Sequence, residues 1–427
     1  MSLLLPLFFT LFFSLIIWKW KWFHDAAIPK YLFIFFFILK VLAGIFAGDL
    51  YLKRYNGGDT YTFFLSSQKL TQSFYDDPAE FTLMVTGIGN DRDFIEKYGE
   101  IIAWDNNDVV YNDNRTIIRI NALIGLVSMQ NYNVHVIFFA FMSMIGLIAI
   151  FKGIRLLTQQ SPFLIVSLLF LVPGVMFWLS MASKESILIF AMGILFYTCV
   201  SLLTISSSFV HILGMFLAGF LFVHIKAYFL VLITPALIAF SWTIVTGNRY
   251  APVKYLLVYL FFGGMFFGLK YFTGFDPVQV VFMKRYNFEA VAQVFSKDMA
   301  SYIEVPEFTS DWQSVLAAFP EAIASVMFRP YLWESDSLLI TFAAIENVLI
   351  LLAIAIGLIY FNRESAIKNS NLIMFCLFFV FSVFVLIGLT TPVMGAIVRY
   401  KAPVLPFLCL IPVLISGGEN SPFKEKI

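Results

Sequence analysis

Charged residues are scarce in this sequence, because Asp, Glu, Lys and Arg together make up only 13% of its 427 residues. The charges also nearly cancel, which leaves a formal net charge of +1 at pH 7. A protein that binds nucleic acid through the phosphates needs clustered Lys and Arg and a clear basic excess. The composition therefore excludes a nucleic-acid partner.

Cysteine is also rare. The sequence contains only Cys199, Cys376 and Cys409, and each lies inside an apolar run. It has no Cys-x-x-Cys pair and no Cys/His spacing of the kind that binds zinc, and three such cysteines make no disulfide framework. We predict that these cysteines are small core residues and that no residues are dedicated to a metal.

Apolar residues dominate instead: they make up 60% of the chain, aromatic residues make up 18%, and the mean hydropathy is +0.86. A helix that crosses a bilayer needs roughly 20 apolar residues. The sequence holds about eleven such runs, some short or interrupted by Pro and Gly: 3–18, 31–48, 134–151, 162–180, 187–206, 209–225, 227–246, 253–270, 337–361, 372–391 and 402–416. We predict an all-α, polytopic integral membrane protein of about 11 transmembrane helices, with residues 1–427 forming a single membrane domain.

Basic residues predict how the runs are oriented. Eleven Lys or Arg and only four Asp or Glu fall in five segments beside the runs: 19–30, 152–161, 247–254, 362–371 and 417–427. Cytoplasmic loops carry such a basic excess, so we expect these segments inside. The N-terminus and the two long segments 49–133 and 271–336 are then expected outside.

The two long outer segments hold most of the polar sequence. Residues 49–116 contain twelve acidic and six basic residues, which favours a well-solvated stretch. Apolar residues recur at helical spacing from Thr60 to Tyr75 and again from Trp312 to Phe328. We predict that these stretches are amphipathic helices in the outer loops.

Five polar clusters interrupt the apolar runs, and the predicted topology places all of them at the outer face: Asp59, Ser183–Glu185, His224 with Lys226, Arg329–Glu334, and Arg399–Lys401. A charge near a bilayer is costly, so such residues are functional candidates by default. We therefore predict one active site that faces outward.

Asp59 follows two glycines, which permit a tight turn at the end of a membrane helix. A carboxylate there can accept a proton from an attacking hydroxyl, so Asp59 is the predicted catalytic base. The structural alternative is that Asp59 caps the helix that follows.

Lys184 and Glu185 lie in a short polar stretch between two apolar runs. If this stretch is buried, the two charges must satisfy one another or bind a ligand, because an unpaired buried charge is costly. The alternative is a polar hairpin in which Ser183 caps the next helix.

The later clusters combine basic and aromatic residues. Arginine's planar fork fits phosphate oxygens, and aromatic rings at the interface stack on sugars or anchor a helix. The predicted substrate-binding residues are Lys184, Glu185, His224, Lys226, Arg329, Glu334, Arg399, Tyr400 and Lys401. For Trp333 and Tyr400 the alternative is interface anchoring, and for His224 with Lys226 it is a plain helix-end pair.

Two motifs together resemble a known family. Gly57-Gly58-Asp59 with Tyr61 in a large outer loop, followed by the stretch Arg119-Ile-Asn-Ala-Leu-Ile-Gly-Leu, is similar to the layout of the GT-C glycosyltransferases. So is Pro173-Gly-Val-Met-Phe-Trp178 followed by Ser183-Lys-Glu185. The resemblance implies a polyprenyl-phosphate-linked sugar donor and an acidic base in the first outer loop, at Asp59. The family's usual acidic pair is a single Asp here, so the resemblance leaves a divalent metal open.

The sequence thus predicts a glycosyltransferase at the outer face of the bacterial cytoplasmic membrane. It would move a sugar or glycan from a polyprenyl-phosphate carrier to an acceptor glycan, lipid or protein. Membrane lipids are its further predicted partners. Within the same chemistry, the spans and outer arginines also resemble a polysaccharide polymerase or ligase of the O-antigen type. A lipid or solute transporter, a flippase, and a purely structural membrane subunit are the alternatives from other classes.

Overall fold

The computed structural model describes residues 3–89, 91–101, 103–104, 113–205, 208–295, 302–309, 311–334 and 337–416. Within these ranges the regular structure is helical, apart from one antiparallel bridge between Tyr302 and Val393. The prediction of an all-α fold is confirmed for the described residues. The chain forms two compact units: the first is 1–152, 176–198 and 208–227, and the second is 153–175, 199–207 and 228–427.

The helices alternate between long apolar elements and shorter ones. In chain order they are α1 (Leu4–Lys19), α2 (Lys30–Tyr55), α3 (Gly58–Asp76), α4 (Pro78–Thr86), α5 (Asp91–Tyr98), α6 (Asp113–Ser128), α7 (Tyr132–Leu157), α8 (Pro162–Phe170), α9 (Pro173–Trp178), α10 (Lys184–Thr204), α11 (Phe209–Thr246), α12 (Ala251–Thr273), α13 (Pro277–Phe295), α14 (Trp312–Phe328), α15 (Leu338–Ile359), α16 (Arg363–Lys368), α17 (Ser370–Thr390), α18 (Met394–Lys401) and α19 (Leu405–Ile415). The long helices are apolar on all sides, which is typical of helices that face lipid and neighbouring helices.

Among the described residues, eight helical stretches are long and apolar enough to cross a membrane: α2, α7, α10, α11, α12, α15, α17 and α18 with α19. This confirms a multi-pass membrane protein, with fewer full-length spans than the sequence predicts. Helix α1 is shorter, at 16 residues. The run 162–180 is split into α8 and α9, because Pro173 cannot continue the hydrogen-bond ladder of α8. The runs 209–225 and 227–246 both lie in α11, which is interrupted at Lys226.

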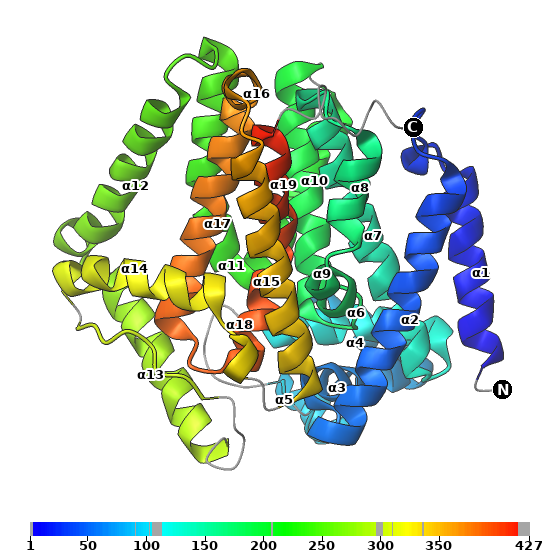
Figure 1. Ribbon diagram of the computed structural model, residues 1–427. Coiled ribbons are helices and arrows are strands. Elements are labelled where there is room, and N and C mark those ends of the chain that lie inside the picture. Colours follow the sequence, from blue (N-terminus) through cyan, green and yellow to red (C-terminus); the bar gives the residue numbers. More distant parts are fainter. Residues whose placement is uncertain are drawn as a thin grey trace. The chain divides into compact units, whose positions relative to one another are not determined.

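In the first unit, α1, α2 and α7 run side by side (Figure 1). Phenylalanine fills their contacts: the ring of Phe13 stacks on Phe141 at 4.3 Å and meets Phe37 edge-on at 6.3 Å. Helices α7 and α10 cross at Gly146 and Gly193, where a Cβ on Gly193 would lie 2.0 Å from the carbonyl oxygen of Gly146. Small residues allow such close backbone packing, which drives helix association in lipid.

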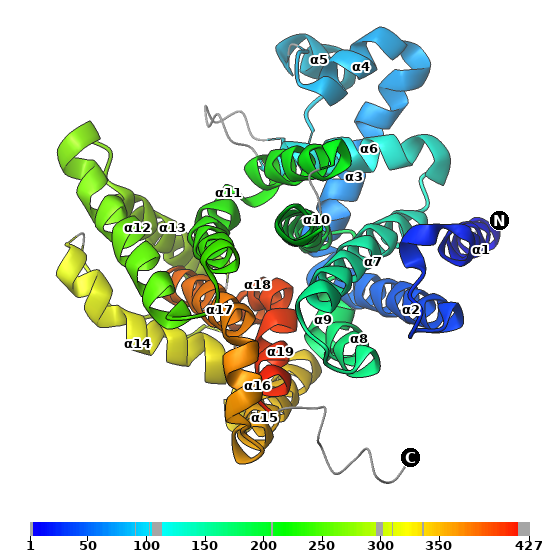
Figure 2. The same cartoon turned by 90° about the horizontal axis from the view of Figure 1, so that it is seen from above.

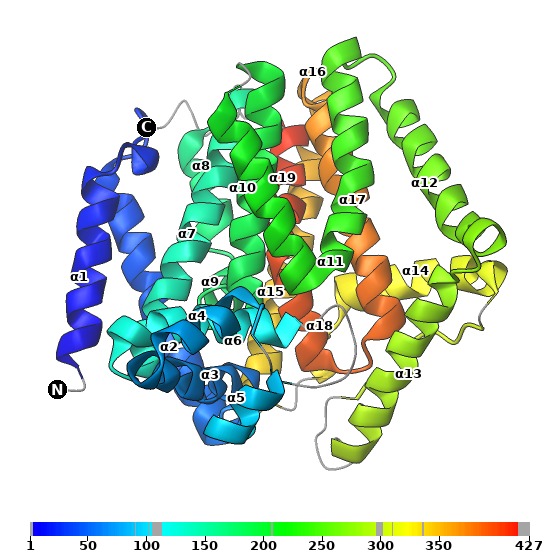
Figure 3. The same ribbon diagram turned by 180° about the vertical axis from the view of Figure 1, so that it is seen from behind.

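Helices α3, α4 and α6 gather at one end of α7 (Figure 3). The predicted amphipathic stretch from Thr60 to Tyr75 is confirmed as part of α3. Its buried face is rich in small hydroxyl residues, and Thr71 donates to the carbonyl of Ala122 on α6 at 3.2 Å. Arg119 and the residues after it lie within α6.

In the second unit, α14 crosses α17 at a steep angle (Figure 1). The two helices touch where Gly388 meets the backbone of Ala322. Seen from above, α17 and α19 are neighbours, and their Phe375 and Phe407 rings lie 5.7 Å apart (Figure 2). Helix α14 coincides with the predicted amphipathic run from Trp312 to Phe328.

Each unit brings the predicted inner segments together at one end. In the first unit, the ammonium of Lys152 lies 4.8 Å from the ring centre of Trp22. In the second, Asn248 donates to the carbonyl of Lys368 at 3.0 Å, and Lys368 donates to Gln159 at 2.8 Å. Segments that share a basic excess in the sequence therefore contact one another within each unit.

Candidate functional site

A sharp turn between α2 and α3 presents Asp59. Asn56, Gly57 and Gly58 have φ values of 48°, 92° and 51°, a left-handed sequence that glycine adopts without strain. Gly57 is the N-cap of α3, so the alternative in which Asp59 is the N-cap is wrong. Asp59 is exposed in the first turn of α3, where the helix dipole favours a negative charge.

Lys184 lies close to the same helix. Its ammonium donates to the side-chain oxygen of Asn114 at 2.6 Å and lies 5.2 Å from the ring centre of Phe63. Phe63 comes four residues after Asp59 on α3, and residues at this spacing share one helix face. A half-buried cation and an exposed carboxylate therefore belong to the same end of the first unit.

Glu185 pairs with Lys226, at 2.9 Å between a carboxylate oxygen and the ammonium, and both side chains are buried. The pair lies at the interruption of α11, where Lys226 has the non-helical dihedral angles φ −155° and ψ 78°. The hydroxyl of Ser183 has no hydrogen-bond partner among the described residues, so it does not cap α10 as the alternative proposed. The buried charge of Glu185 is thus compensated by a lysine from another helix.

His224 and Lys226 are near in sequence but differ in environment. His224 is exposed, and its Nδ1 lies 2.9 Å from the carbonyl oxygen of Phe220 on the same helix. Lys226 is buried. The structure therefore brings Lys226, and not His224, into contact with Glu185.

Aromatic packing holds the start of α3 in place. The Tyr61 ring stacks on Tyr132 at 3.9 Å, and the Tyr132 hydroxyl donates to Thr60 at 3.0 Å. Burial, with the nearby charge of Asp49 as a smaller contribution, raises the pKa of Tyr61. Tyr61 thus stays protonated near neutral pH and can donate a hydrogen bond.

In the second unit, Arg329 follows α14 and pairs with Glu334 at 3.3 Å. Its guanidinium lies 5.9 Å from the ring centre of Tyr331. Tyr331 stacks on Trp333 at 4.8 Å with the rings nearly parallel, and Trp333 is 80% exposed. The cluster therefore presents a flat aromatic surface beside a partly exposed cation.

Lys401 is buried and holds the end of α14. Its ammonium donates to the carbonyls of Val326 and Arg329 at 3.2 and 3.1 Å and to Asn347 at 2.7 Å. An ammonium has three donors, so protein acceptors take all of them. The contact also brings the Arg329 cluster next to α18.

Glu346 and Asn347 face the interior of the second unit, as expected for polar residues within an apolar run, and each is 2% exposed. Asn347 also donates to the carbonyls of Phe328 and Pro330, both at 3.2 Å. One carboxylate oxygen of Glu346 accepts from the backbone of Gly174. Asn347 is thus part of the polar network around the end of α14, whereas the hydrogen bond of Glu346 is to the start of α9.

Arg399 and Tyr400 complete this cluster. Both are half-buried, and the guanidinium lies 5.3 Å from the centre of the Tyr400 ring. Tyr400 meets Phe288 of α13 edge-on at 6.4 Å. Arg329, Arg399 and Tyr400 therefore belong to one region of the second unit, with α13 beside it.

Sequence reasoning missed Asn114, Phe63 and Tyr132 in the first unit. Each acts through a partner far away in the chain, as Asn114 does with Lys184, 70 residues later. No local spacing signals such a pair.

Among the residues that the structure describes, no three His, Cys, Asp or Glu side chains gather closely enough to hold a metal ion. No family model, no curated protein and no solved structure matches this chain.

Proposed function

We propose that this protein is a membrane glycosyltransferase, which moves a sugar or glycan from a polyprenyl-phosphate carrier to an acceptor at the outer face of the bacterial cytoplasmic membrane. The observation that carries the proposal is that Asp59 and Lys184 both belong to the surroundings of α3 in the first unit. Asp59 is exposed in the first turn of α3, and the ammonium of Lys184 lies over the ring of Phe63, four residues later on the same helix. This arrangement suits a reaction that needs both a proton acceptor and a cation for a phosphate.

In the proposed reaction the acceptor hydroxyl attacks the anomeric carbon of the donor sugar. A new glycosidic bond forms as the bond between this carbon and the phosphate oxygen breaks, and the phosphate leaves with the electron pair. Asp59 takes the proton of the hydroxyl. Lys184 stabilises the charge that develops on the phosphate, and electrostatic stabilisation of this kind is often the largest catalytic effect.

In the second unit, Arg329 and Arg399 are candidates for binding a phosphate in their own right. Both are half-buried guanidinium groups beside aromatic rings. A guanidinium binds phosphate oxygens in a bidentate manner that lysine does not reproduce. Lys226 and Lys401 fit this role less well, because protein partners already surround them.

The test compares two carboxylates of α3. Asp59→Asn removes the proton acceptor at nearly constant volume, so turnover should fall by about 10²–10⁴-fold. Asp76→Asn, at the exposed far end of the same helix, should leave turnover unchanged. The assay follows sugar transfer from a panel of polyprenyl-phosphate hexoses by mass spectrometry, with the protein in nanodiscs. Near-normal turnover by Asp59→Asn would reject Asp59 as the base.

A transporter or flippase is favoured by one observation, the break in α11 at Lys226, because interrupted membrane helices form substrate sites in many transporters. An experiment on the wild-type protein separates the two functions. A transporter would move a fluorescent polyprenyl-phosphate sugar across a proteoliposome membrane without forming a new glycosidic bond. Flux of the intact lipid with no transfer product would replace the proposed function.

A further inference from the structure

The outer segment of the second unit forms a firm surface from three elements: α13, the start of α14, and the extended stretch 302–309. The backbone of Ile303 donates to the carbonyl of Pro392 at 2.9 Å, which ties the stretch to the residues that follow α17. Beneath it, Phe308 packs with Val278 of α13 and Val315 of α14 in a buried apolar cluster. The residues beneath this surface are therefore packed in fixed positions, and hollows on it keep their shape.

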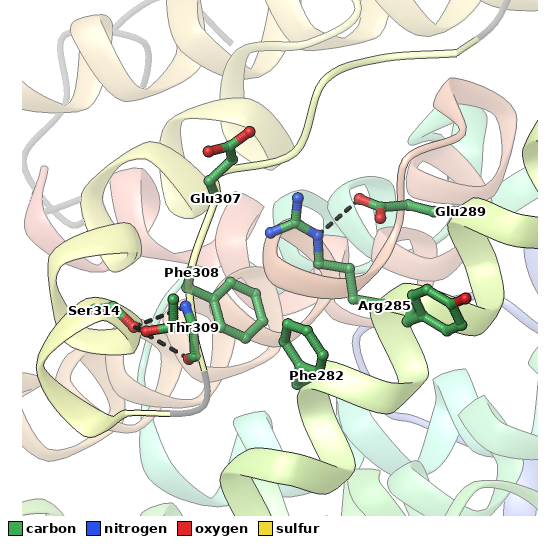
Figure 4. Close-up of a pocket in the computed structure, with 8 residues that line it drawn as sticks. Phe282, Arg285, Glu289, Glu307, Phe308, Thr309 and Ser314 are labelled. Carbon is green, nitrogen blue, oxygen red and sulfur yellow. Dashed lines mark hydrogen bonds and ion pairs between the residues drawn. The ribbon is translucent and has the colours of Figure 1, made fainter.

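The first hollow has a volume of about 400 Å³ and lies between α13 and the stretch 302–309 (Figure 4). Arg285 organises it: the guanidinium donates to Glu289 at 2.7 Å, donates to the carbonyl of Pro306, and lies 5.3 Å from the ring centre of Phe308. The exposed ring of Tyr286 lines the same hollow.

A second hollow, of about 460 Å³, adjoins the first, and Thr309 lines both. The end of α12 and the start of α14 form its walls, with the exposed rings of Tyr271 and Trp312. Lys270 pairs with Asp276 at 2.8 Å on the same wall. Each hollow is within the range of roughly 300–1,000 Å³ that is usual for small-ligand sites.

Side chains on the wall that the two hollows share form hydrogen bonds with one another. Thr309 donates to the carboxylate of Asp311, which also accepts from the backbone of Ser314 at 2.9 Å and caps α14. The hydrogen bond from Thr309, followed by the one from Ser314, lowers the pKa of Asp311. The shared wall is therefore anionic at neutral pH and fixed in shape.

The charges of the two hollows limit what they bind. Four carboxylates line them, and the two cations, Arg285 and Lys270, are each paired with one of these carboxylates. An anionic ligand, such as a phosphate or an acidic polymer, would meet a net negative surface. A neutral sugar fits better. Carboxylates accept hydrogen bonds from sugar hydroxyls, amides and hydroxyls both donate and accept them, and exposed aromatic rings pack against the apolar faces of sugar rings.

We propose that the two hollows form one groove that binds a neutral oligosaccharide, with the sugar rings resting on Tyr286 in the first hollow and on Trp312 in the second. The role of this glycan as the acceptor rests on the proposed function, whereas the binding itself does not. A neutral glycan at this groove fits a polymerase or ligase within the same chemistry.

The experiment measures direct binding of neutral glucose, galactose and N-acetylglucosamine oligosaccharides to the full-length protein in nanodiscs by saturation-transfer NMR. At least one series should bind saturably, and its longer members should bind more tightly than its disaccharide. Tyr286→Ala and Trp312→Ala should each weaken binding by about tenfold or more. Phe272→Ala should not, because Phe272 is 90% exposed and lines neither hollow.

Three results would overturn the groove: no saturable binding of any neutral oligosaccharide, equal binding by both groove variants and the wild type, or tighter binding of uronic-acid oligosaccharides or of a peptide. The second result would assign Trp312 and Tyr286 to interface anchoring. Glycan binding by the Asp59→Asn variant distinguishes the groove from the proposed glycosyltransferase function. If Asp59→Asn binds the glycan normally but the wild-type protein transfers no sugar, the groove stands and the glycosyltransferase proposal fails.

Discussion

Lys226 in the first unit and Lys401 in the second are both buried, but their surroundings compensate the charge differently. Lys226 lies 2.9 Å from the carboxylate of Glu185, whereas Lys401 is surrounded by two backbone carbonyls and the amide oxygen of Asn347. In the first case a carboxylate in direct contact balances the lysine. In the second, carbonyls at the end of a helix accept its hydrogen bonds, and the carboxylate of Glu346 attracts it without direct contact. Both were candidates for binding substrate, and both hold helices together.

The comparison also separates the buried lysines from the accessible charges. Asp59 is exposed, and Lys184, Arg329 and Arg399 are half-buried. Substitution of a buried lysine should therefore change stability first, and substitution of an accessible charge should change activity first. The predictions below test this division.

The largest effect is expected at the Glu185–Lys226 pair. Either Glu185→Leu or Lys226→Met alone removes one member of a buried ion pair and should destabilise the protein by about 3–5 kcal/mol. The double variant should recover most of this loss, because both charges are then absent. Thermal unfolding of the four proteins in one detergent gives the coupling energy. Additive losses in the double variant would show that the pair is not coupled.

Lys401→Met should be next in size. It removes the shared donor of two backbone carbonyls and of Asn347, and the loss should be about 1–3 kcal/mol, the cost of a buried polar group without its hydrogen bond. The matched control is Lys184→Met, since Lys184 is half-buried and should lose activity with little loss of stability. The thermal midpoint and sugar transfer are measured for both variants. Wild-type stability combined with lost donor binding in Lys401→Met would give Lys401 a substrate role.

The sequence was sufficient to predict an all-α membrane fold, although not the number of full-length spans, because apolarity along the chain marks the long helices directly. The run from Trp312 to Phe328 became α14, and the basic segments around Asn248 and Lys368 meet in the structure. Lys226 was also recognised as an interruption between two apolar runs, although helix continues on both sides of it.

Partner choice could not be predicted in this way. Glu185 is 41 residues from Lys226, and Asn347 is 54 residues from Lys401. Which side chains meet depends on how the helices pack. Hydropathy does not predict this packing, because helices of equal apolarity have the same hydropathy whichever neighbour they contact. The groove was missed for the same reason, since its walls come from four separate elements.

Arg399 should show an intermediate effect. Arg399→Lys keeps the charge but loses the bidentate geometry, so use of the polyprenyl-phosphate donor should fall by about tenfold, or roughly 1.4 kcal/mol. Arg399→Ala should lose on the order of 2–5 kcal/mol. Donor affinity is measured beside the thermal midpoint. If the affinity is unchanged, or if unfolding accounts for the whole defect, Arg399 does not contact the phosphate.

The smallest effect is expected from acid at the wall of the groove. The folded protein lowers the pKa of Asp311 through the Thr309 hydroxyl, and that of Asp276 through Lys270. A carboxylate whose pKa is lower in the folded state adds stability above its ordinary pKa of 3.8, and this stability is lost as the pH falls through the folded value. Stability and glycan binding should therefore not change through these groups between about pH 7 and pH 5.

Asp311→Asn keeps an efficient helix cap without the titrating group, so below the ordinary pKa it should lose less stability than the wild type. Unfolding by urea at a series of pH values measures this difference, and an identical acid loss in both proteins would mean that Asp311 carries no part of it.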